Sequence, residues 1–386
     1  MTETFDALET RPAAEAPGVL DTPSLLLDAD KLERNCDRMR ERLAAQRVTL
    51  RPHVKTAKCV EVAVTALRAP SGPITVSTLR EAEYFADHGF RDILYAVGMV
   101  GRKVPRAARL VKRGVDLGVI VDSVEAARDL VQASAREGVR IPALVEIDSD
   151  GHRAGIPPDD SRLFEVARAL GPALRGVMTH AGESYNCTSV GAIEAMATRE
   201  REAVSAAAMA LRERGHECPV VSVGSTPTAT FARSFDGVTE VRVGVYVFQD
   251  LVMAGLGVCS VNDIALSVLA TVVGHQREKN WLITDAGWMA LSRDRGTARQ
   301  KLDQGYGLVC DALGRPIDGL VVADANQEHG IVARRDRGPI DFARFPIGSR
   351  VRVLPNHACA TAAQFPEYQV LRAGRPAEVW ERFGGW

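Results

Sequence analysis

Short apolar runs alternate with longer amphipathic stretches through the first two thirds of the chain, and this alternation limits the possible folds more than any other feature. We predict strands at residues 25–27, near 50, 74–76, 93–96, 117–121, 143–147, 176–179, 220–223 and 240–243. Helical stretches lie between them, for example at 31–46, 78–88, 124–137 and 193–214. Roughly eight strand–helix units over about 230 residues predict an α/β fold built on a parallel β/α barrel of the TIM type.

A doubly wound open sheet is the alternative arrangement. We rank it second, because the Gly-x-Gly-x-x-Gly turn typical of that fold does not follow the first predicted strand. The pattern changes near residue 265, after which apolar strands at 266–273, 281–284, 320–322, 350–354 and 368–372 are separated by turn residues. We therefore expect an N-terminal arm (1–20), a barrel (21–265) and a second, mostly β C-terminal domain (266–386).

Charge and cysteine content exclude several classes of protein. The 48 Lys and Arg residues nearly balance the 49 Asp and Glu residues, so no basic field favours nucleic acid or an anionic membrane surface. The acidic N-terminus does not have the pattern of a signal peptide, and no apolar run reaches the ~18 residues of a membrane span. The seven cysteines are scattered, which is typical of reduced thiols. We expect a cytoplasmic protein.

The segment Arg51-Pro52-His53-Val54-Lys55-Thr56 follows the strand predicted near residue 50. The carboxyl ends of barrel strands carry the active site in this fold, so Lys55 is expected there. A Schiff-base lysine needs a lowered pKa, and Arg51, His53 and Lys58 are candidate neighbouring cations. The alternative is a basic surface loop. We interpret Lys55 as the lysine that binds pyridoxal phosphate (PLP).

A second candidate segment, Val223-Gly224-Ser225-Thr226-Pro227, follows a late barrel strand. Glycine lets backbone N–H groups face an anion, and Ser225 and Thr226 add hydroxyl donors. Backbone N–H groups around Gly244 and Val245, after the next strand, would complete a phosphate site. An ordinary turn is the alternative reading of this segment.

The tripeptide His357-Ala358-Cys359 is a candidate metal site. On an extended chain the two outer side chains project to the same face. Imidazole and thiolate suit Zn²⁺, with Mn²⁺ or another divalent ion left open. Two protein ligands leave positions for water or substrate, as in a catalytic site. A buried strand end is the alternative.

These motifs and their order resemble the D-serine dehydratase and D-threonine aldolase family, fold-type III PLP enzymes related to alanine racemase. The resemblance extends from Thr22 to Cys359 and rests on segments 51–56, 146–155, 180–185, 224–226, 244–248, 285–288, 327–330 and 357–359. It implies that Lys55 carries PLP and that further residues contact the cofactor, namely His53, Arg153, His180, Tyr185, Gly224, Ser225, Thr226, Gly244, Val245 and Tyr246. Some relatives have His where Glu183 stands, which leaves the role of Glu183 and the substrate side chain open.

The metal pair helps to choose a reaction within the family. Family aldolases tend to have His-x-Asp where dehydratases have His-x-Cys with zinc, so Cys359 favours a dehydratase acting on D-3-hydroxy amino acids and releasing a 2-keto acid and ammonia. Lys55 is the expected base at Cα. His329, in Gln327-Glu328-His329-Gly330, is a further catalytic candidate that would orient the metal's water; a structural histidine is the alternative. Retro-aldol cleavage to glycine and an aldehyde would use the same parts.

Other functions explain less of the sequence. A racemase of this fold needs no metal pair, and non-catalytic PLP carriers are usually shorter single barrels. A structural or interaction module explains none of the motif order. The resemblance also implies a homodimer, and we expect a small-molecule D-amino acid to be the binding partner.

Overall fold

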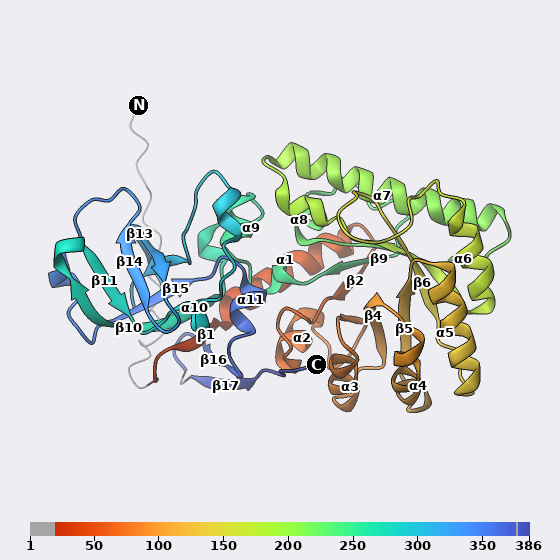
Figure 1. The fold of residues 1–386 in the computed structure, drawn as a ribbon, viewed down its shortest axis with the longest axis horizontal. Coiled ribbons are helices and arrows are strands. Elements are labelled where there is room, and N and C mark those ends of the chain that lie inside the picture. Colours follow the sequence, from red (N-terminus) through yellow and green to blue (C-terminus); the bar gives the residue numbers. More distant parts are fainter. Residues whose placement is uncertain (1–19, 376) are drawn as a thin grey trace.

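The computed structural model describes residues 20–375 and 377–386, so most of the arm predicted at 1–20 lies outside the described residues. Two domains lie side by side, a barrel and a mostly β domain (Figure 1). Eight parallel strands form the barrel sheet in the order β2-β9-β8-β7-β6-β5-β4-β3. A parallel bridge between His53 and Thr75 joins the end strands. The predicted β/α barrel is therefore confirmed as a nearly closed parallel barrel.

The barrel strands are short and buried, as parallel strands covered by helices must be. Their bounds are β2 (Thr49–Pro52), β3 (Ile74–Val76), β4 (Asp92–Gly98), β5 (Asp116–Val121), β6 (Ala143–Ile147), β7 (Leu174–Thr179), β8 (Val220–Val223) and β9 (Glu240–Val243). Helix α1 (Ala29–Ala45) precedes these strands. The helices between and after them are α2 (Val60–Leu67), α3 (Leu79–Asp87), α4 (Val104–Lys112), α5 (Val124–Arg136), α6 (Arg162–Leu170), α7 (Val190–Glu213), α8 (Thr226–Phe231) and α9 (Leu251–Gly255).

Local sequence explains where these helices begin and which face they bury. Asp28 caps α1, because its carboxylate accepts a hydrogen bond from the Lys31 backbone N–H at 2.9 Å. Leu32, Cys36 and Leu43 lie on one face of α1 and are buried against the barrel. Ser and Thr side chains cap α3, α5 and α7 in the same way.

The β domain is a nine-stranded sheet in the order β11-β14-β13-β12-β15-β10-β1-β16-β17. The bounds are β1 (Ser24–Asp28), β10 (Leu266–Gln276), β11 (Trp281–Thr284), β12 (Leu308–Cys310), β13 (Pro316–Ala325), β14 (Gly330–Arg334), β15 (Arg350–Leu354), β16 (Glu367–Leu371) and β17 (Glu378–Glu381). Two short helices, α10 (Trp288–Leu291) and α11 (Ala358–Ala362), interrupt it. In Figure 1, α11 lies at the junction of the two domains.

One strand lies where the sequence did not predict it. We expected the run at 25–27 to begin the barrel, but β1 pairs antiparallel with β10 and parallel with β16 in the β domain. All three leucines, Leu25, Leu26 and Leu27, are buried. A run that is apolar on both faces fits a central strand of either sheet, which is why periodicity alone could not assign it.

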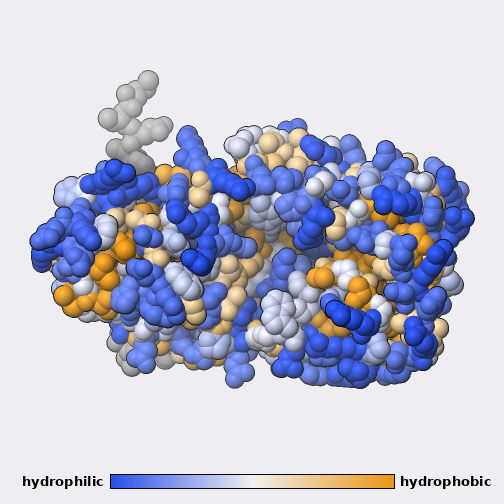
Figure 2. Space-filling view, viewed as in Figure 1, coloured by the Kyte–Doolittle hydropathy of each residue, from blue (hydrophilic) through white to orange (hydrophobic). Residues whose placement is uncertain are grey.

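The surface carries both hydrophilic and hydrophobic residues. Hydrophilic residues predominate on the face shown in Figure 2, and hydrophobic residues form smaller groups on both domains. Among the described residues, the helices are all too short or too polar to cross a membrane.

Candidate active site

A cavity of about 710 Å³ lies at the carboxyl ends of the barrel strands, where the β domain approaches the barrel. Lys55 enters it after β2, and Cys359 enters it from α11. These two residues are 304 positions apart in the sequence but close in space, because the charge of the Lys55 ammonium contributes to lowering the pKa of the Cys359 thiol. The predicted cofactor lysine and the predicted metal pair therefore share one cavity.

Lys55 is the free amine of this cavity. Its side chain is exposed to the cavity and makes no hydrogen bond or ion pair with any residue that the structure describes. The cations expected around it are not available. Arg51 is buried and binds Glu240 and Asp92, each at 2.7 Å, while Lys58 lies 3.2 Å from Glu81. The idea that they activate Lys55 is wrong, because both are neutralised by carboxylates elsewhere.

Two histidines beside Lys55 are held neutral. Burial and the nearby Lys55 charge place the pKa of His53 well below its usual value. Burial lowers the pKa of His180 to about 3, although its Nδ1 contacts the Gly224 carbonyl oxygen at 2.5 Å. That contact requires a proton on Nδ1, so the Nε2 of His180 is an acceptor. Both imidazoles near Lys55 are therefore neutral, and the charges of Lys55 and Arg242 help to keep them so.

The turn after β8 has the shape of an anion site. A Cβ at Gly224, whose φ is +156°, would lie 1.8 Å from the Arg242 carbonyl oxygen, and one at Gly244 would lie 2.7 Å from Thr56 Oγ1. The Thr226 hydroxyl is buried without a hydrogen-bond partner among the described residues. The Ser225 hydroxyl is already engaged, since it lies 2.8 Å from Ser184 Oγ and 2.9 Å from Thr228 Oγ1. The residues present fit a phosphate held by backbone N–H groups and Thr226.

A buried carboxylate that the sequence did not single out fixes this turn. Glu200, on α7, accepts hydrogen bonds from the backbone N–H of Gly224 at 2.9 Å and of Ala181 at 3.1 Å. It thereby ties the phosphate turn to the segment that carries His180 and Tyr185. Burial raises the pKa of Glu200, an effect that these backbone donors oppose. No motif marks Glu200, because it lies in the middle of a long helix.

Tyr185 lines the cavity, but Tyr246 does not. Burial raises the pKa of Tyr185, so its hydroxyl stays protonated, and it hydrogen-bonds the backbone of Thr226. Tyr246 is fully buried, and the titratable groups that act on its hydroxyl, Cys36 and Arg40, both belong to α1. Tyr246, which we expected to contact the cofactor, is therefore not among the residues that line this cavity and lies close to α1.

The His357 and Cys359 side chains meet at the start of α11. His357 has extended backbone angles (φ −133°, ψ 106°), as we predicted, but α11 begins at the next residue, so Cys359 lies on a helical turn and not on an extended chain. Burial alone would raise the pKa of Cys359, but the hydrogen bond and charge of His357, with Thr56 at 3.2 Å, lower it. An adjacent imidazole and a thiol with lowered pKa are suitable donors for a soft divalent ion. No cluster of three or more metal-binding side chains occurs among the described residues.

Asp294 supports the metal pair and was not recognised from the sequence. Its Oδ2 lies 2.7 Å from His357 Nδ1, which leaves Nε2 as the nitrogen available to a metal. Asp250 supports it from the other side, because its Oδ2 accepts a hydrogen bond from the Ala358 N–H at 3.0 Å. Asp294 is 63 residues from His357, and no local pattern connects them.

Of the remaining candidate residues, one lines the cavity and two do not. Arg153 lines the cavity and lies 3.7 Å from Glu146. Glu183 lies outside it and binds His152 at 2.7 Å near the surface. His329 is exposed on the turn between β13 and β14 and is not among the residues that line the cavity. We therefore withdraw His329 as a catalytic group within the same chain.

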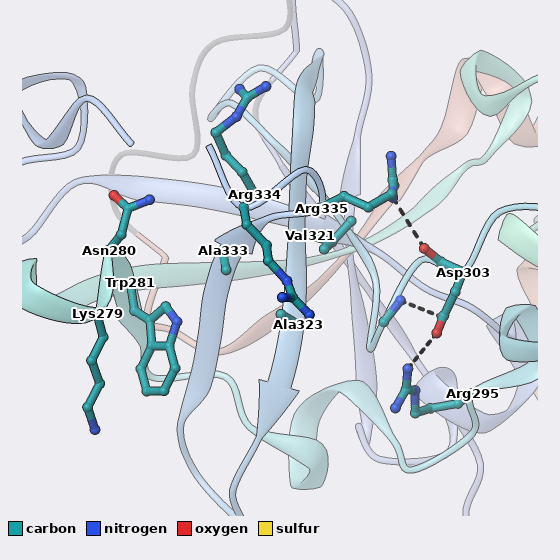
Figure 3. A pocket seen from close by; sticks show the side chains of 12 residues that line it. Lys279, Asn280, Trp281, Arg295, Asp303, Val321, Ala323, Ala333, Arg334 and Arg335 are labelled. Atoms are coloured by element: carbon teal, nitrogen blue, oxygen red, sulfur yellow. Dashed lines mark hydrogen bonds and ion pairs between the residues drawn. The ribbon is translucent and has the colours of Figure 1, made fainter. Parts of the chain in front are cut away.

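Besides this cavity, the β domain has a concave region of about 490 Å³ (Figure 3). It is lined mainly by basic and apolar side chains, including Lys279, Trp281, Arg334 and Arg337. Arg295 lines both cavities, and Figure 3 shows it held by Asp303, with 2.8 Å between Nη2 and Oδ2. This second region contains none of the predicted cofactor or metal residues.

A parallel barrel with a lysine and a glycine-rich phosphate turn at one end, joined to a β domain, defines the class of fold-type III PLP enzymes. The family model "Alanine racemase, N-terminal domain" matches residues 27–251, and a serine dehydratase domain model matches residues 265–371. The chain belongs to the family of D-serine dehydratases and D-threonine aldolases, and it is a PLP-dependent lyase of that family.

Three relatives illustrate its place in the family. The chain is 56% identical to D-threo-3-hydroxyaspartate dehydratase of Delftia sp. (strain HT23), over 95% of this chain and 98% of that protein. The structure of that enzyme covers 95% of this chain and 99% of its own, with a TM-score of 0.93 and 55% identity. D-serine dehydratase of Dictyostelium discoideum is 32% identical over 94% and 98% of the two chains. The D-threonine aldolase structure from Filomicrobium marinum has a TM-score of 0.79 and 26% identity, over 96% and 97%.

Proposed function

We propose that this protein is a PLP- and metal-dependent dehydratase that converts D-3-hydroxy amino acids to a 2-keto acid and ammonia. The main observation that supports this proposal is that the free Lys55 amine and the His357/Cys359 pair line one cavity. Two relatives named D-threo-3-hydroxyaspartate dehydratase and D-serine dehydratase support the same reaction.

The cofactor would be held by Lys55 and by the turn at Gly224 and Thr226, with Tyr185 and neutral His180 around it. When bound, PLP supplies an electron sink that acidifies the α-proton of an amino acid, and a divalent ion supplies a Lewis acid for the 3-hydroxyl. Because His53 and His180 are neutral, neither would attract the substrate carboxylate as a cation.

Lys55 is the base in this proposal. Its amine lines the cavity without a competing partner in the described structure, so it could take the proton from Cα of a bound substrate. His357 and Cys359 would hold the ion at the 3-hydroxyl, which makes hydroxide a better leaving group. Asp294 fixes the imidazole, and Asp250 fixes the backbone that carries it.

We further propose zinc as the ion, because imidazole and thiolate donors select it over harder cations. The structure of a cysteine-to-alanine variant of a D-threo-3-hydroxyaspartate dehydratase, 54% identical to this chain, is of a metal-free form, which supports a metal in that relative. A homodimer in the cytoplasm completes the proposal, supported by the family resemblance and by seven cysteines that form no disulfide.

The products test this function directly. Purified protein loaded with PLP and zinc is incubated with D-threo-3-hydroxyaspartate, D-serine and D-threonine. Ammonia together with a 2-keto acid is the expected result. Glycine together with an aldehyde would contradict it and would assign the chain to the aldolases, the alternative that uses the same lysine and metal pair.

A further inference from the structure

A short segment of the β domain forms part of the cavity wall beside the metal pair. Asp294, Arg295 and Arg299 all line the cavity. The segment is fixed to the strand end that carries His357, because the Thr297 hydroxyl donates to the Asn356 side chain at 2.7 Å. Asp294 adds its own contact to His357. Side chains from this segment therefore face the cavity from the metal side.

Four arginines line the cavity, and three of them are already neutralised or engaged. Arg242 is buried in the barrel, where it hydrogen-bonds Ser222 and the Thr179 carbonyl. Arg295 binds Asp303 and lies over the Tyr306 ring, 5.4 Å from its centroid. Arg153 has Glu146 nearby. Each of these guanidinium groups therefore has a partner within the protein.

Arg299 is the exception. It is exposed to the cavity and has no hydrogen bond or ion pair with any described residue. The carboxylates that line the cavity are Asp250 and Asp294, and both are occupied, by backbone N–H groups and by His357 respectively. No carboxylate of the described lining is free to neutralise Arg299, so its natural partner is an anionic group of the ligand.

We propose that Arg299 binds the distal carboxylate of a 3-hydroxy dicarboxylic D-amino acid and so selects such substrates over D-serine. This proposal rests on the function proposed above. A substrate with its Cα at Lys55 and its 3-hydroxyl toward His357 and Cys359 directs the other C3 substituent to the metal side of the cavity. Serine has only hydrogen there, whereas a carboxylate would meet the guanidinium of Arg299.

The test compares substrates in R299Q and R299K. In R299Q, the ratio of kcat/KM for D-threo-3-hydroxyaspartate to that for D-serine should fall ~10- to 100-fold, mainly through KM, because a charge-assisted contact present in ground and transition state alike is lost. R299K should recover part of the loss. R293Q is the matched control, since Arg293 lies over Trp288, 4.8 Å from the ring centroid, and does not line the cavity. Its substrate ratio should match the wild type.

A binding measurement separates this proposal from the proposed function. D-aspartate and D-alanine lack the 3-hydroxyl, so their binding, followed through the visible absorption of the bound cofactor, does not depend on dehydration. The wild type should prefer D-aspartate, and R299Q should reduce that preference ~10- to 100-fold. Equal effects on both ligands, or no effect on either, would overturn the role of Arg299. A wild type that binds D-aspartate selectively but releases no keto acid from D-threo-3-hydroxyaspartate would instead overturn the dehydratase.

Discussion

At the scale of single residues, the chemistry depends on groups that carry it and on groups that position them. Lys55, His357 and Cys359 are readable from the sequence because each lies in a short motif after a predicted strand. Asp294 and Glu200 are not, because they act on residues 63 and 24 positions away through contacts that only the fold creates. Arg299 is not either, because only the fold brings it to the cavity. For Tyr246 and His329 the motif suggested a role in the site, but neither residue lines the cavity. Tyr246 is buried in the core and His329 lies on an exposed turn.

The support of His357 by Asp294 predicts a measurable change in metal binding. D294N should weaken the affinity for zinc about 10- to 100-fold, because the imidazole loses the carboxylate that orients it and raises its basicity. Competition with a chromophoric chelator measures this without any turnover. D303N is the control, since Asp303 binds Arg295 and not His357. Unchanged zinc affinity in D294N would show that the contact is merely structural.

At the scale of elements, the Asn356 side chain joins the strand end before α11 to the segment around Arg299, in addition to the contact between Asp294 and His357. Asn356 is buried, accepts from Thr297 at 2.7 Å and donates to the Gly305 carbonyl at 2.6 Å. The barrel strands and most β-domain strands follow apolar runs and were predictable. The strands β12, β14 and β17 were not, because β12 and β17 are only 3 and 4 residues long and polar residues interrupt the pattern around β14.

N356A should therefore lower both stability and activity. We expect a loss of about 2 kcal/mol in the free energy of unfolding, since buried partners lose their hydrogen bonds, together with a lower kcat/KM. The control is N280G in the β domain, where Asn280 also makes two such bonds, to Gly338 O and Ile340 N, at a φ of +57° that glycine tolerates. Urea unfolding and steady-state kinetics measure the two quantities. If N356A lost stability but kept full activity, Asn356 would not position the cavity.

At the scale of the whole molecule, the two domains are not consecutive pieces of chain. β1 lies in the middle of the β-domain sheet, between β10 and β16, although it precedes the entire barrel. The Asp28 N–H donates to the Ala265 carbonyl at 2.8 Å, so the chain leaves this sheet and returns to it at the same point. The sequence pattern predicted both domains but not the place of β1 in the second sheet, because strands about 240 residues apart leave no local signal of their pairing.

This arrangement predicts the behaviour of fragments. Residues 265–386 alone should not fold cooperatively, since removal of β1 leaves two unpaired strand edges within the sheet. The same fragment preceded by residues 20–28 and an Asn-Gly turn between Asp28 and Ala265 should gain structure, because it restores β1 as a hairpin with β10. Circular dichroism and limited proteolysis distinguish the two. Equal protection of both fragments would contradict a structural role for β1.

Metal removal tests the shared cavity most directly. Protein that retains PLP is stripped of metal with a chelator, and ammonia release from D-serine is measured as zinc is returned. We predict that the visible absorption of the Lys55-bound cofactor persists without metal, that ammonia release is lost, and that it returns in proportion to zinc bound, up to a single ion per chain. Full ammonia release from metal-free protein would contradict the account.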